Sequence, residues 1–317
     1  CHYVQLLTDG ITNKLVLCSN TYQDGSEEHL LVRIYGHKTD LLIDREAEIR
    51  NIRLLHTFDL SPTLYATFEN GLIYEYIPGN TLSAEDVTRP EIYKLVAVRM
   101  AKMHKVQDSN TQKPRASLWL KLQQFVDLIP DEFQDQNKNK RYAEMKFSKS
   151  QLLQEIKQIR EAVSDFVMPV VFAHNDLLLG NIIYNKTKNE VFFIDFEYAC
   201  YNYQPFDIGN HFAEFAGVND VDYSRYPKKE LQLDWLRTYL MEYKGKSTVS
   251  DHEIEVLYVQ VNKFALAAHL FWYSWALIQA AHSHIDFDFI QYASIRLQEY
   301  FNRKTAFLNM ELPTGLL

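Results

Sequence analysis

Three polar residues stand at the ends of short apolar runs in the middle of the chain. An apolar run leads to Asp176, Asn181 follows five positions later, and another apolar run ends directly before Asp195. Runs of this length favour buried strands, and the two later runs read as a hairpin. The three side chains are therefore expected close together at strand ends. The expected strands are 167–172, 182–185 and 191–194.

This set of oxygen groups suits phosphoryl transfer from a nucleotide to a hydroxyl. One carboxylate positions the attacking hydroxyl and accepts its proton, while a second carboxylate and a side-chain carbonyl hold Mg²⁺ against the phosphates. The spacing of Asp176 and Asn181 equals that of the protein-kinase pattern H-R-D-x-x-x-x-N, and Asp195 stands where the aspartate of D-F-G stands. A polar β-turn would use the same residue types, but the flanking apolar runs argue against it.

The first part of the chain reads as a small sheet with one inserted helix. Asp9-Gly10 and Asn70-Gly71 are hairpin signals between strand-like runs. Between them, apolar residues at helical spacing and early acidic residues predict a helix over 44–57. We therefore expect five mostly antiparallel strands, at 2–7, 14–19, 29–35, 64–68 and 72–77.

The character of the sequence changes at Pro78-Gly79, and helical periodicity dominates afterwards. The polar stretch 131–149 has no clear pattern, so we expect a surface excursion there. These features predict an α+β protein with a lobe over 1–77, a helical lobe over 78–317, and a cleft at the joint. The expected helices are 91–104, 118–128, 150–164, 230–243, 251–281 and 286–301.

Composition indicates an ordinary globular protein. The 317 residues are 47% hydrophobic and 23% charged with a formal net charge of −8, whereas a general nucleic-acid binder would usually be basic. We find no apolar run of membrane-spanning length, and the three cysteines lack metal-ligand spacing, so a reducing, cytoplasmic location is expected. The chain opens on Cys1 with a strand-like run, which indicates a truncated amino terminus.

Longer motifs resemble the choline/ethanolamine kinase family, and more closely its ethanolamine branch. The segments HNDLLLGNIIYN, IDFEYACYNYQPFDIGNHFAEFAGV and LVRIYG carry the resemblance, which runs from DGITNKL to WYSWALIQA and covers nearly the whole chain. It implies a two-lobed protein-kinase-like fold with a small five-stranded antiparallel N-lobe and a larger, mainly helical C-lobe. It also implies that Asp176 is the catalytic base and that Asn181 and Asp195 complete the catalytic set by holding Mg²⁺.

The resemblance implies that the first lobe binds ATP. Arg33 would contact phosphate where protein kinases use a lysine, with Glu48 as its ion-pair partner, and the planar guanidinium group suits phosphate. From the residues alone, Arg33 reads as an ordinary surface charge on an edge strand. Lys14 and Lys38 are alternative phosphate ligands.

Two other segments of the first lobe are candidates for nucleotide binding. In the turn at 9–13, Gly10, Thr12 and Asn13 offer main-chain and side-chain groups to phosphate oxygens, although a plain hairpin turn is the alternative. At the end of the last strand, the main chains of Glu75 and Ile77 would face adenine in a kinase-like fold. The alternative is a hinge without ligand contact.

The helical lobe holds the candidate residues for substrate binding. The resemblance implies that Asp207 braces the catalytic loop. Glu214, about two helical turns further on, would lie on the same helix face and pair with a substrate ammonium. Trp272 and Trp275 share a helix face, and the family match places them with Tyr292 around a cationic head, where cation–π attraction acts. A solvated helix charge and a core aromatic stripe are the alternatives.

The identity of the amine is the least determined part of the prediction. A trimethylammonium head suits aromatic walls, whereas a primary ammonium needs acceptors for three N–H donors, and Glu214 serves either. The segments HNDLL and HFAEFAGV favour ethanolamine, giving phosphoethanolamine for phosphatidylethanolamine synthesis by the CDP-ethanolamine route. Choline kinase, a kinase of another small cationic alcohol and a catalytically silent binding module are the alternatives. We expect no nucleic-acid partner and no stable membrane insertion, and a homodimer stays open.

Overall fold

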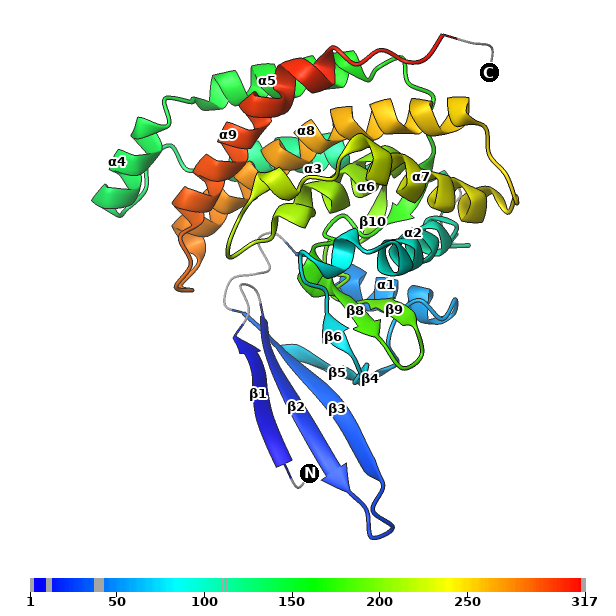
Figure 1. Ribbon diagram of the computed structural model, residues 1–317. Helices are drawn as coiled ribbons and strands as arrows, with labels where there is room; N and C mark the ends of the chain where they lie inside the picture. The colour runs from blue at the N-terminus through cyan, green and yellow to red at the C-terminus, as the bar shows by residue number, and fades with distance from the viewer. Residues whose placement is uncertain (1–2, 10–12, 37–42, 110, 112, 315–317) are drawn as a thin grey trace.

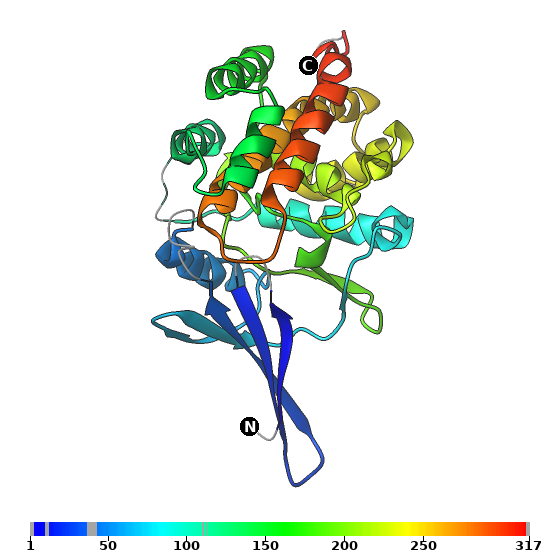
Figure 2. The same cartoon turned by 90° about the vertical axis from the view of Figure 1, so that its left-hand side faces the viewer.

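A five-stranded antiparallel sheet forms the first lobe, as expected. The computed structural model describes residues 3–9, 13–36, 43–109, 111 and 113–314. The strands are β1 (Tyr3–Asp9), β2 (Asn13–Thr21), β3 (Glu27–Tyr35), β4 (Leu64–Phe68) and β5 (Gly71–Glu75). Their order is β1-β2-β3-β5-β4, so β3 is a central strand and not the edge strand that a surface Arg33 would require. The ends of β1, β2 and β3 extend away from the helices (Figures 1 and 2).

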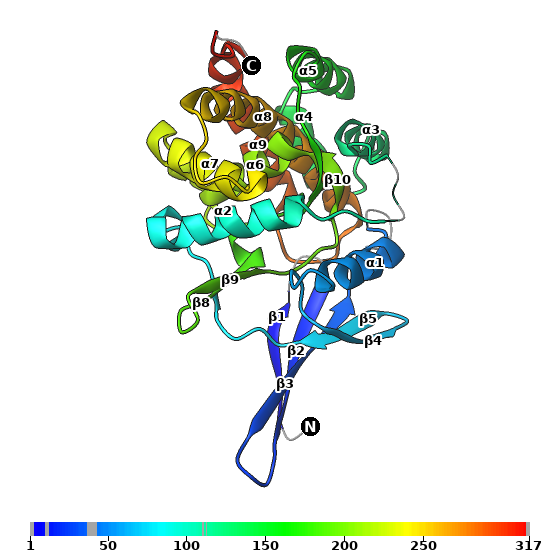
Figure 3. The same ribbon diagram turned by 90° about the vertical axis from the view of Figure 1, so that its right-hand side faces the viewer.

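Helix α1 (Arg45–His56) lies between the sheet and the second lobe (Figure 3). Asp44 caps its amino terminus, and Glu48 points into the interior with no exposed surface. The Asn51 amide donates to the main-chain carbonyl of Ala199 at 2.6 Å. This helix therefore links the sheet to the segment that follows Asp195 in the sequence.

The two lobes join after β5 at Pro78-Gly79. Gly79 has a φ of +148°, and a Cβ atom there would lie 2.6 Å from the carbonyl oxygen of Tyr184, so glycine is required. The next strand, β6 (Asn80–Thr81), pairs with β8 (Ile182–Asn185). The joint is thus held directly against the segment that carries the catalytic motif.

Helices make up most of the second lobe, and one of them forms its core. The helices are α2 (Pro90–His104), α3 (Leu118–Leu128), α4 (Gln136–Glu144), α5 (Lys149–Ala162), α6 (Gln204–Ala213), α7 (Lys229–Lys244), α8 (Asp251–His282) and α9 (Phe289–Leu308). Helix α8 packs against α3, α5, α6, α7 and α9. By length and composition it could cross a membrane, contrary to the sequence-based expectation, but 94% of its apolar window is buried inside the protein. Its apolar surface is therefore used as core.

The polar stretch 131–149, expected as a surface excursion, contains helix α4, which has no buried residue and which the sequence pattern did not predict. Asp135 caps this helix through hydrogen bonds from two main-chain N–H groups. Tertiary contacts hold it in place: Lys138 Nζ donates to the Ala280 carbonyl at 2.6 Å, and Arg141 pairs with Asp288 at 2.8 Å. The contacts of Lys138 and Arg141 are with residues far away in the sequence, so the hydrophobic pattern of the stretch could not indicate them.

The catalytic segment, residues 170–203, is built on short strands. β7 (Val170–Ala173) precedes the loop, and β8 forms the expected hairpin with β9 (Glu190–Phe193). β7 pairs antiparallel with β10 (Cys200–Tyr203), a strand that the sequence pattern did not predict. The catalytic segment therefore lies between two small sheets.

Candidate active site

The loop after β7 brings Asp176 and Asn181 together. Asn181 Nδ2 donates to the main-chain carbonyl of Asp176 at 2.9 Å and lies 3.4 Å from its Oδ2. The carbonyl of Asn181 accepts from the N–H of Ile194 at 3.0 Å, which brings the following residue, Asp195, to the same place. Asn175 and Asp195 have left-handed backbone conformations, with φ of 64° and 63°. Such conformations are costly for residues other than glycine, and they mark a loop whose shape is imposed by its surroundings.

Asp207 on α6 supports this loop from behind. Its carboxylate accepts hydrogen bonds from the main-chain N–H groups of His174 and Asn175, at 2.9 and 2.6 Å, and from His104 Nε2 at 2.8 Å. Burial alone would raise the pKa of Asp207, but His104 and His174 outweigh it and lower that pKa. The expected bracing role of Asp207 is confirmed by these contacts.

Arg33 joins the first lobe to the second. Its guanidinium group donates to Glu48 on α1, and its Nη1 donates to Asp195 Oδ1 at 2.6 Å. The side chains of Arg33 and Glu48 are 6% and 0% exposed. Arg33 is therefore a buried cation next to the candidate metal ligand, and not a surface charge.

A second acidic residue, Glu197, lies beside Asp195. Glu197 Oε2 accepts from Asn13 Nδ2 at 3.1 Å and from Arg45 Nη1 at 3.0 Å. Arg45 Nη1 also donates to Glu48 at 3.0 Å, so one arginine bridges α1 and the segment after β9. Sequence reasoning missed Glu197 and Arg45. The only local signal for Glu197 was its position two residues after Asp195.

These oxygen groups fit a divalent cation. Carboxylate oxygens of Glu48, Asp195 and Glu197 lie within 4.8 Å of one another, and the main chain of Asn181 is bound to that of Ile194, the neighbour of Asp195. Hard oxygen ligands of this kind suit Mg²⁺. The donor set is therefore compatible with the expected metal.

Burial and neighbouring carboxylates raise the pKa of Asp176. Burial raises the pKa of Asp176 well above its ordinary value, and the charges of Asp195, Glu214 and Glu197 raise it further, while Arg296 lowers it. Carboxylates with raised pKa values are typical of groups that exchange protons in catalysis.

The candidate nucleotide residues are only partly described. Gly10, Thr12 and Lys38 lie outside the described residues. Asn13 is buried and contacts Glu197, and Ile77 is buried at the joint.

The side chain of Glu75 faces the sheet. It accepts from the main-chain N–H and the hydroxyl of Thr63, at 3.0 and 2.8 Å. The main-chain N–H of Glu75 donates to the carbonyl of Thr63 at 2.9 Å, so Thr63 contacts both the side chain and the main chain of Glu75.

Aromatic side chains from α8 and α9 gather near the catalytic loop. Trp272 and Trp275 are buried with ring centroids 5.5 Å apart, and Tyr292 is buried on α9. Glu214 lies at the end of α6, where its carboxylate is bound by Arg296. The four expected substrate residues are thus in one part of the second lobe, with an arginine that the sequence analysis did not single out.

Two hydrogen bonds attach the tryptophans to the catalytic segment. Trp275 Nε1 donates to the hydroxyl of Tyr198 at 2.8 Å, and Trp272 Nε1 donates to Asn210 Oδ1 at 2.7 Å. Asn210 Nδ2 in turn donates to the carbonyl of Asn175 at 3.2 Å. The orientation of the aromatic cluster is therefore coupled to the loop that holds Asp176.

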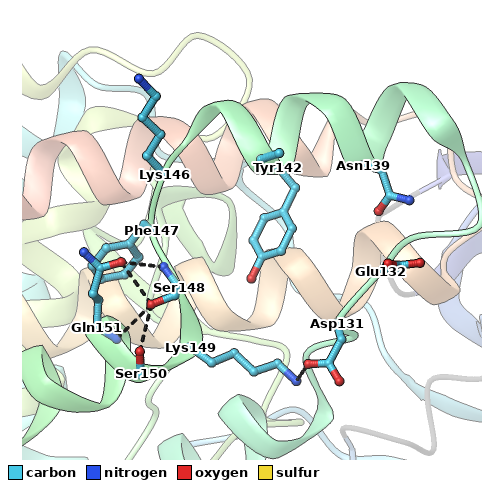
Figure 4. Close-up of a pocket in the computed structure, with 11 residues that line it drawn as sticks. Asp131, Glu132, Asn139, Tyr142, Lys146, Phe147, Ser148, Lys149, Ser150 and Gln151 are labelled. Carbon is cyan, nitrogen blue, oxygen red and sulfur yellow. Dashed lines mark hydrogen bonds and ion pairs between the residues drawn. The ribbon is translucent and has the colours of Figure 1, made fainter.

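Two open surface cavities lie apart from these residues. One, of about 840 Å³, is lined by α4, the start of α5 and the residues before α4. Figure 4 shows the ring of Tyr142 inside it and the pair between Lys149 and Asp131 at its rim. The other, of about 920 Å³, is lined by the end of α2 and the residues after it, by β7 and β10, and by the end of α7. Neither is lined by Asp176 or Asp195.

The two-lobed fold and the meeting of Asp176, Asn181, Asp195 and Arg33 define a protein-kinase-like phosphotransferase. Solved structures agree with this assignment. A Plasmodium vivax ethanolamine kinase superimposes with a TM-score of 0.83 at 30% identity, covering 94% of this chain and 81% of that one. A Cryptosporidium parvum choline kinase gives a TM-score of 0.78 at 24% identity, covering 97% and 90%.

The family model for choline/ethanolamine kinase matches residues 4–301, and the chain belongs to this family. It is 55% identical to an ethanolamine kinase of Drosophila melanogaster over 289 residues, which is 90% of this chain. It is 49% identical to ethanolamine kinase 1 of Mus musculus over 314 residues, which is 98% of this chain. The matched part spans 56% of the fly protein and 86% of the mouse protein.

Proposed function

We propose that this chain transfers the γ-phosphate of ATP to the hydroxyl of ethanolamine. The observation that carries the proposal is the meeting of Asp176, Asn181 and Asp195, with Arg33 bound to Asp195 at 2.6 Å. These groups are what phosphoryl transfer to an alcohol requires. Curated relatives between 47% and 55% identical over at least 90% of this chain carry the name ethanolamine kinase, which supports ethanolamine over choline.

Asp176 is proposed as the base. Its carboxylate would orient the substrate hydroxyl and accept the proton as the new O–P bond forms and the bond to the leaving ADP oxygen breaks. Arg33, oriented by Glu48, would contact the phosphates. Asn181 and Asp195 would hold Mg²⁺, with Glu197 beside them, and the bound ion would offset the charge of the phosphate oxygens.

The amine head is proposed to bind among Glu214, Trp272, Trp275 and Tyr292. The aromatic faces attract a cation, and a carboxylate accepts hydrogen bonds from a primary ammonium. Trimethylammonium heads would gain the first interaction and not the second. This difference is the physical basis for preferring ethanolamine.

Residues 1–77 are proposed as the nucleotide-binding lobe and 78–317 as the lobe for catalysis and substrate binding. Gly10, Thr12 and Asn13 would approach the phosphates, and the main chains of Glu75 and Ile77 would face adenine. The product, phosphoethanolamine, would enter phosphatidylethanolamine synthesis. A cytoplasmic location suits this role, and sedimentation would show whether the chain forms a homodimer.

A coupled ADP-release assay with ethanolamine and choline in parallel tests the proposal. We expect a higher kcat/KM for ethanolamine and loss of turnover in Asp176→Ala and Asp195→Ala. A higher kcat/KM for choline would make the protein a choline kinase. Undiminished turnover in both variants would refute the assigned roles.

A further inference from the structure

Arg296 lies inside the proposed amine site, although it came from no motif. It is on α9, one turn after Tyr292, and is 1% exposed. Its guanidinium group donates to Glu214 Oε1, and its Nε and Nη2 donate to the hydroxyl of Tyr292 at 3.0 and 2.6 Å. Its Nη1 makes no hydrogen bond within the part of the chain that the structure describes. Tyr223 also interacts with this cation, so Arg296 lies among one carboxylate and two tyrosine side chains.

Aromatic rings connect Arg296 to the catalytic segment. Six rings form a row from Tyr198 to Tyr292, and the centroids of adjacent rings in it are between 4.9 and 5.8 Å apart. The row ends on Tyr292, whose ring centroid lies 5.1 Å from the guanidinium carbon. Arg296 also acts electrostatically on Asp176, lowering its pKa. The row is Tyr198, Trp272, Trp275, Phe289, Phe287 and Tyr292.

The contacts of Arg296 decide which acceptors a substrate would meet. Glu214 Oε1 is bound to Arg296, whereas no described residue donates a hydrogen bond to Oε2. The Tyr292 oxygen already receives two N–H groups, which leaves its hydroxyl as a donor. Oε2 of Glu214 is therefore the acceptor that this group of residues keeps for a primary ammonium.

The pair is also buried. The side chains of Arg296 and Glu214 are 1% and 2% exposed, and an ion buried this deeply is costly without a partner. With Arg296 removed, nothing would hold the Glu214 carboxylate in the position from which Oε2 meets an ammonium. A quaternary head, which donates no hydrogen bond, would be affected less.

We propose that Arg296 is a positioning residue that determines amine specificity. It holds the Glu214 carboxylate through Oε1 and directs Oε2 toward the ammonium, which favours a primary over a quaternary amine. This inference rests on the proposed function and adds a residue that acts through Glu214.

Steady-state kinetics of Arg296→Met with ethanolamine, choline and ATP test this role. The KM of ethanolamine should rise about tenfold or more, as for loss of a charged hydrogen bond, while the KM of ATP changes by less than about twofold. The ratio of kcat/KM for ethanolamine to that for choline should fall about tenfold. Arg303→Met is the matched control, since Arg303 lies on the same helix and pairs with Glu299 at 2.5 Å. It should leave the ratio unchanged.

A double-mutant cycle keeps the test decisive if Arg296→Met folds poorly. The combination of Glu214→Gln with Arg296→Met removes both charges, which buried sites often tolerate. Because Arg296 acts through Glu214, the double variant should be no worse for ethanolamine than Glu214→Gln alone. Multiplying effects, or an unchanged ethanolamine-to-choline ratio in an active protein, would overturn the inference. A wild-type protein inactive on ethanolamine would instead refute the proposed function.

Discussion

Replacing Asp207 with asparagine should weaken both the fold and catalysis, because this carboxylate holds the catalytic loop from behind. Asp207 is fully buried and accepts hydrogen bonds from His104, His174 and Asn175, at 2.8, 2.9 and 2.6 Å. Asparagine has nearly the same size, so no cavity forms. The change therefore reports on charge and hydrogen bonding alone.

The expected loss of unfolding free energy in Asp207→Asn follows from the number of hydrogen-bond acceptors that remain. Asparagine keeps one oxygen, so at least one of these donors would face an NH₂ group. Loss of a hydrogen bond to a charged group costs about 1.5–3 kcal/mol, and the buried donor left unpaired costs about 1–3 kcal/mol more. The free energy of unfolding should fall by about 3–5 kcal/mol, which lowers the Tm by roughly 5–10 °C in a chain of this length. A displacement of Asp176 by about 1 Å would lower kcat by about 100-fold.

Thermal unfolding and ADP release at saturating substrates measure the two effects of Asp207→Asn. Asp234→Asn is the matched control, because Asp234 accepts from the Tyr93 hydroxyl at 2.6 Å and pairs with Lys94 but is 39% exposed. That control should change stability by less than about 1 kcal/mol. A normal kcat in Asp207→Asn would refute the idea that this residue positions the loop, and a normal Tm would refute the estimate of its hydrogen bonds.

Three further predictions concern the metal, the buried ion pair and acid stability. Asp195→Asn should raise the Mg²⁺ concentration for half-maximal rate and leave the KM of ethanolamine within about twofold; an unchanged Mg²⁺ titration would remove Asp195 from the metal site. Glu48→Gln should destabilise the protein by about 3 kcal/mol and weaken ATP binding, because it removes the buried one of the two carboxylates that Arg33 contacts; nucleotide titration and thermal melts measure both. Burial lowers the pKa of His174 below 6.5, and the pKa of Asp207 lies below 3.8, so at these two groups the unfolded chain binds more protons in acid, whereas the raised pKa of Asp176 acts in the opposite sense. The urea midpoint should therefore fall as the pH drops through about 6.5 and again as it drops below about 4, and a flat profile over both steps would contradict this.

Local patterns predicted the catalytic segment and most of the fold. The spacing of Asp176 and Asn181 and the run before Asp195 needed only neighbouring residues to be recognised. The five-stranded sheet followed from alternation and from two hairpin signals, and the structure confirms it. Strand β10 was missed because its partner, β7, lies far away in sequence and the strand itself has no clear alternation.

Buried arginines were the main features that the sequence could not indicate. From the residues alone Arg33 read as a surface charge, and only the family resemblance paired it with Glu48, while Arg45 and Arg296 carried no motif at all. Their burial depends on carboxylates from other elements, such as Glu48 and Glu214. Because an arginine is buried only when a distant partner meets it, residue type and local spacing cannot show which arginines belong to the interior.

The balance of buried charges explains why a cationic alcohol and a metal–nucleotide complex suit the same site. Arginines partly neutralise the carboxylates around the catalytic loop, but acidic groups remain in excess, and their mutual repulsion contributes to the raised pKa of Asp176. Each cation that enters, an ammonium at one end or a divalent ion at the other, reduces this repulsion. A neutral or anionic alcohol would leave the excess uncompensated, so the carboxylates proposed to bind Mg²⁺ would also disfavour such substrates. The acidic groups are Glu48, Asp176, Asp195, Glu197 and Glu214, and the arginines are Arg33, Arg45 and Arg296.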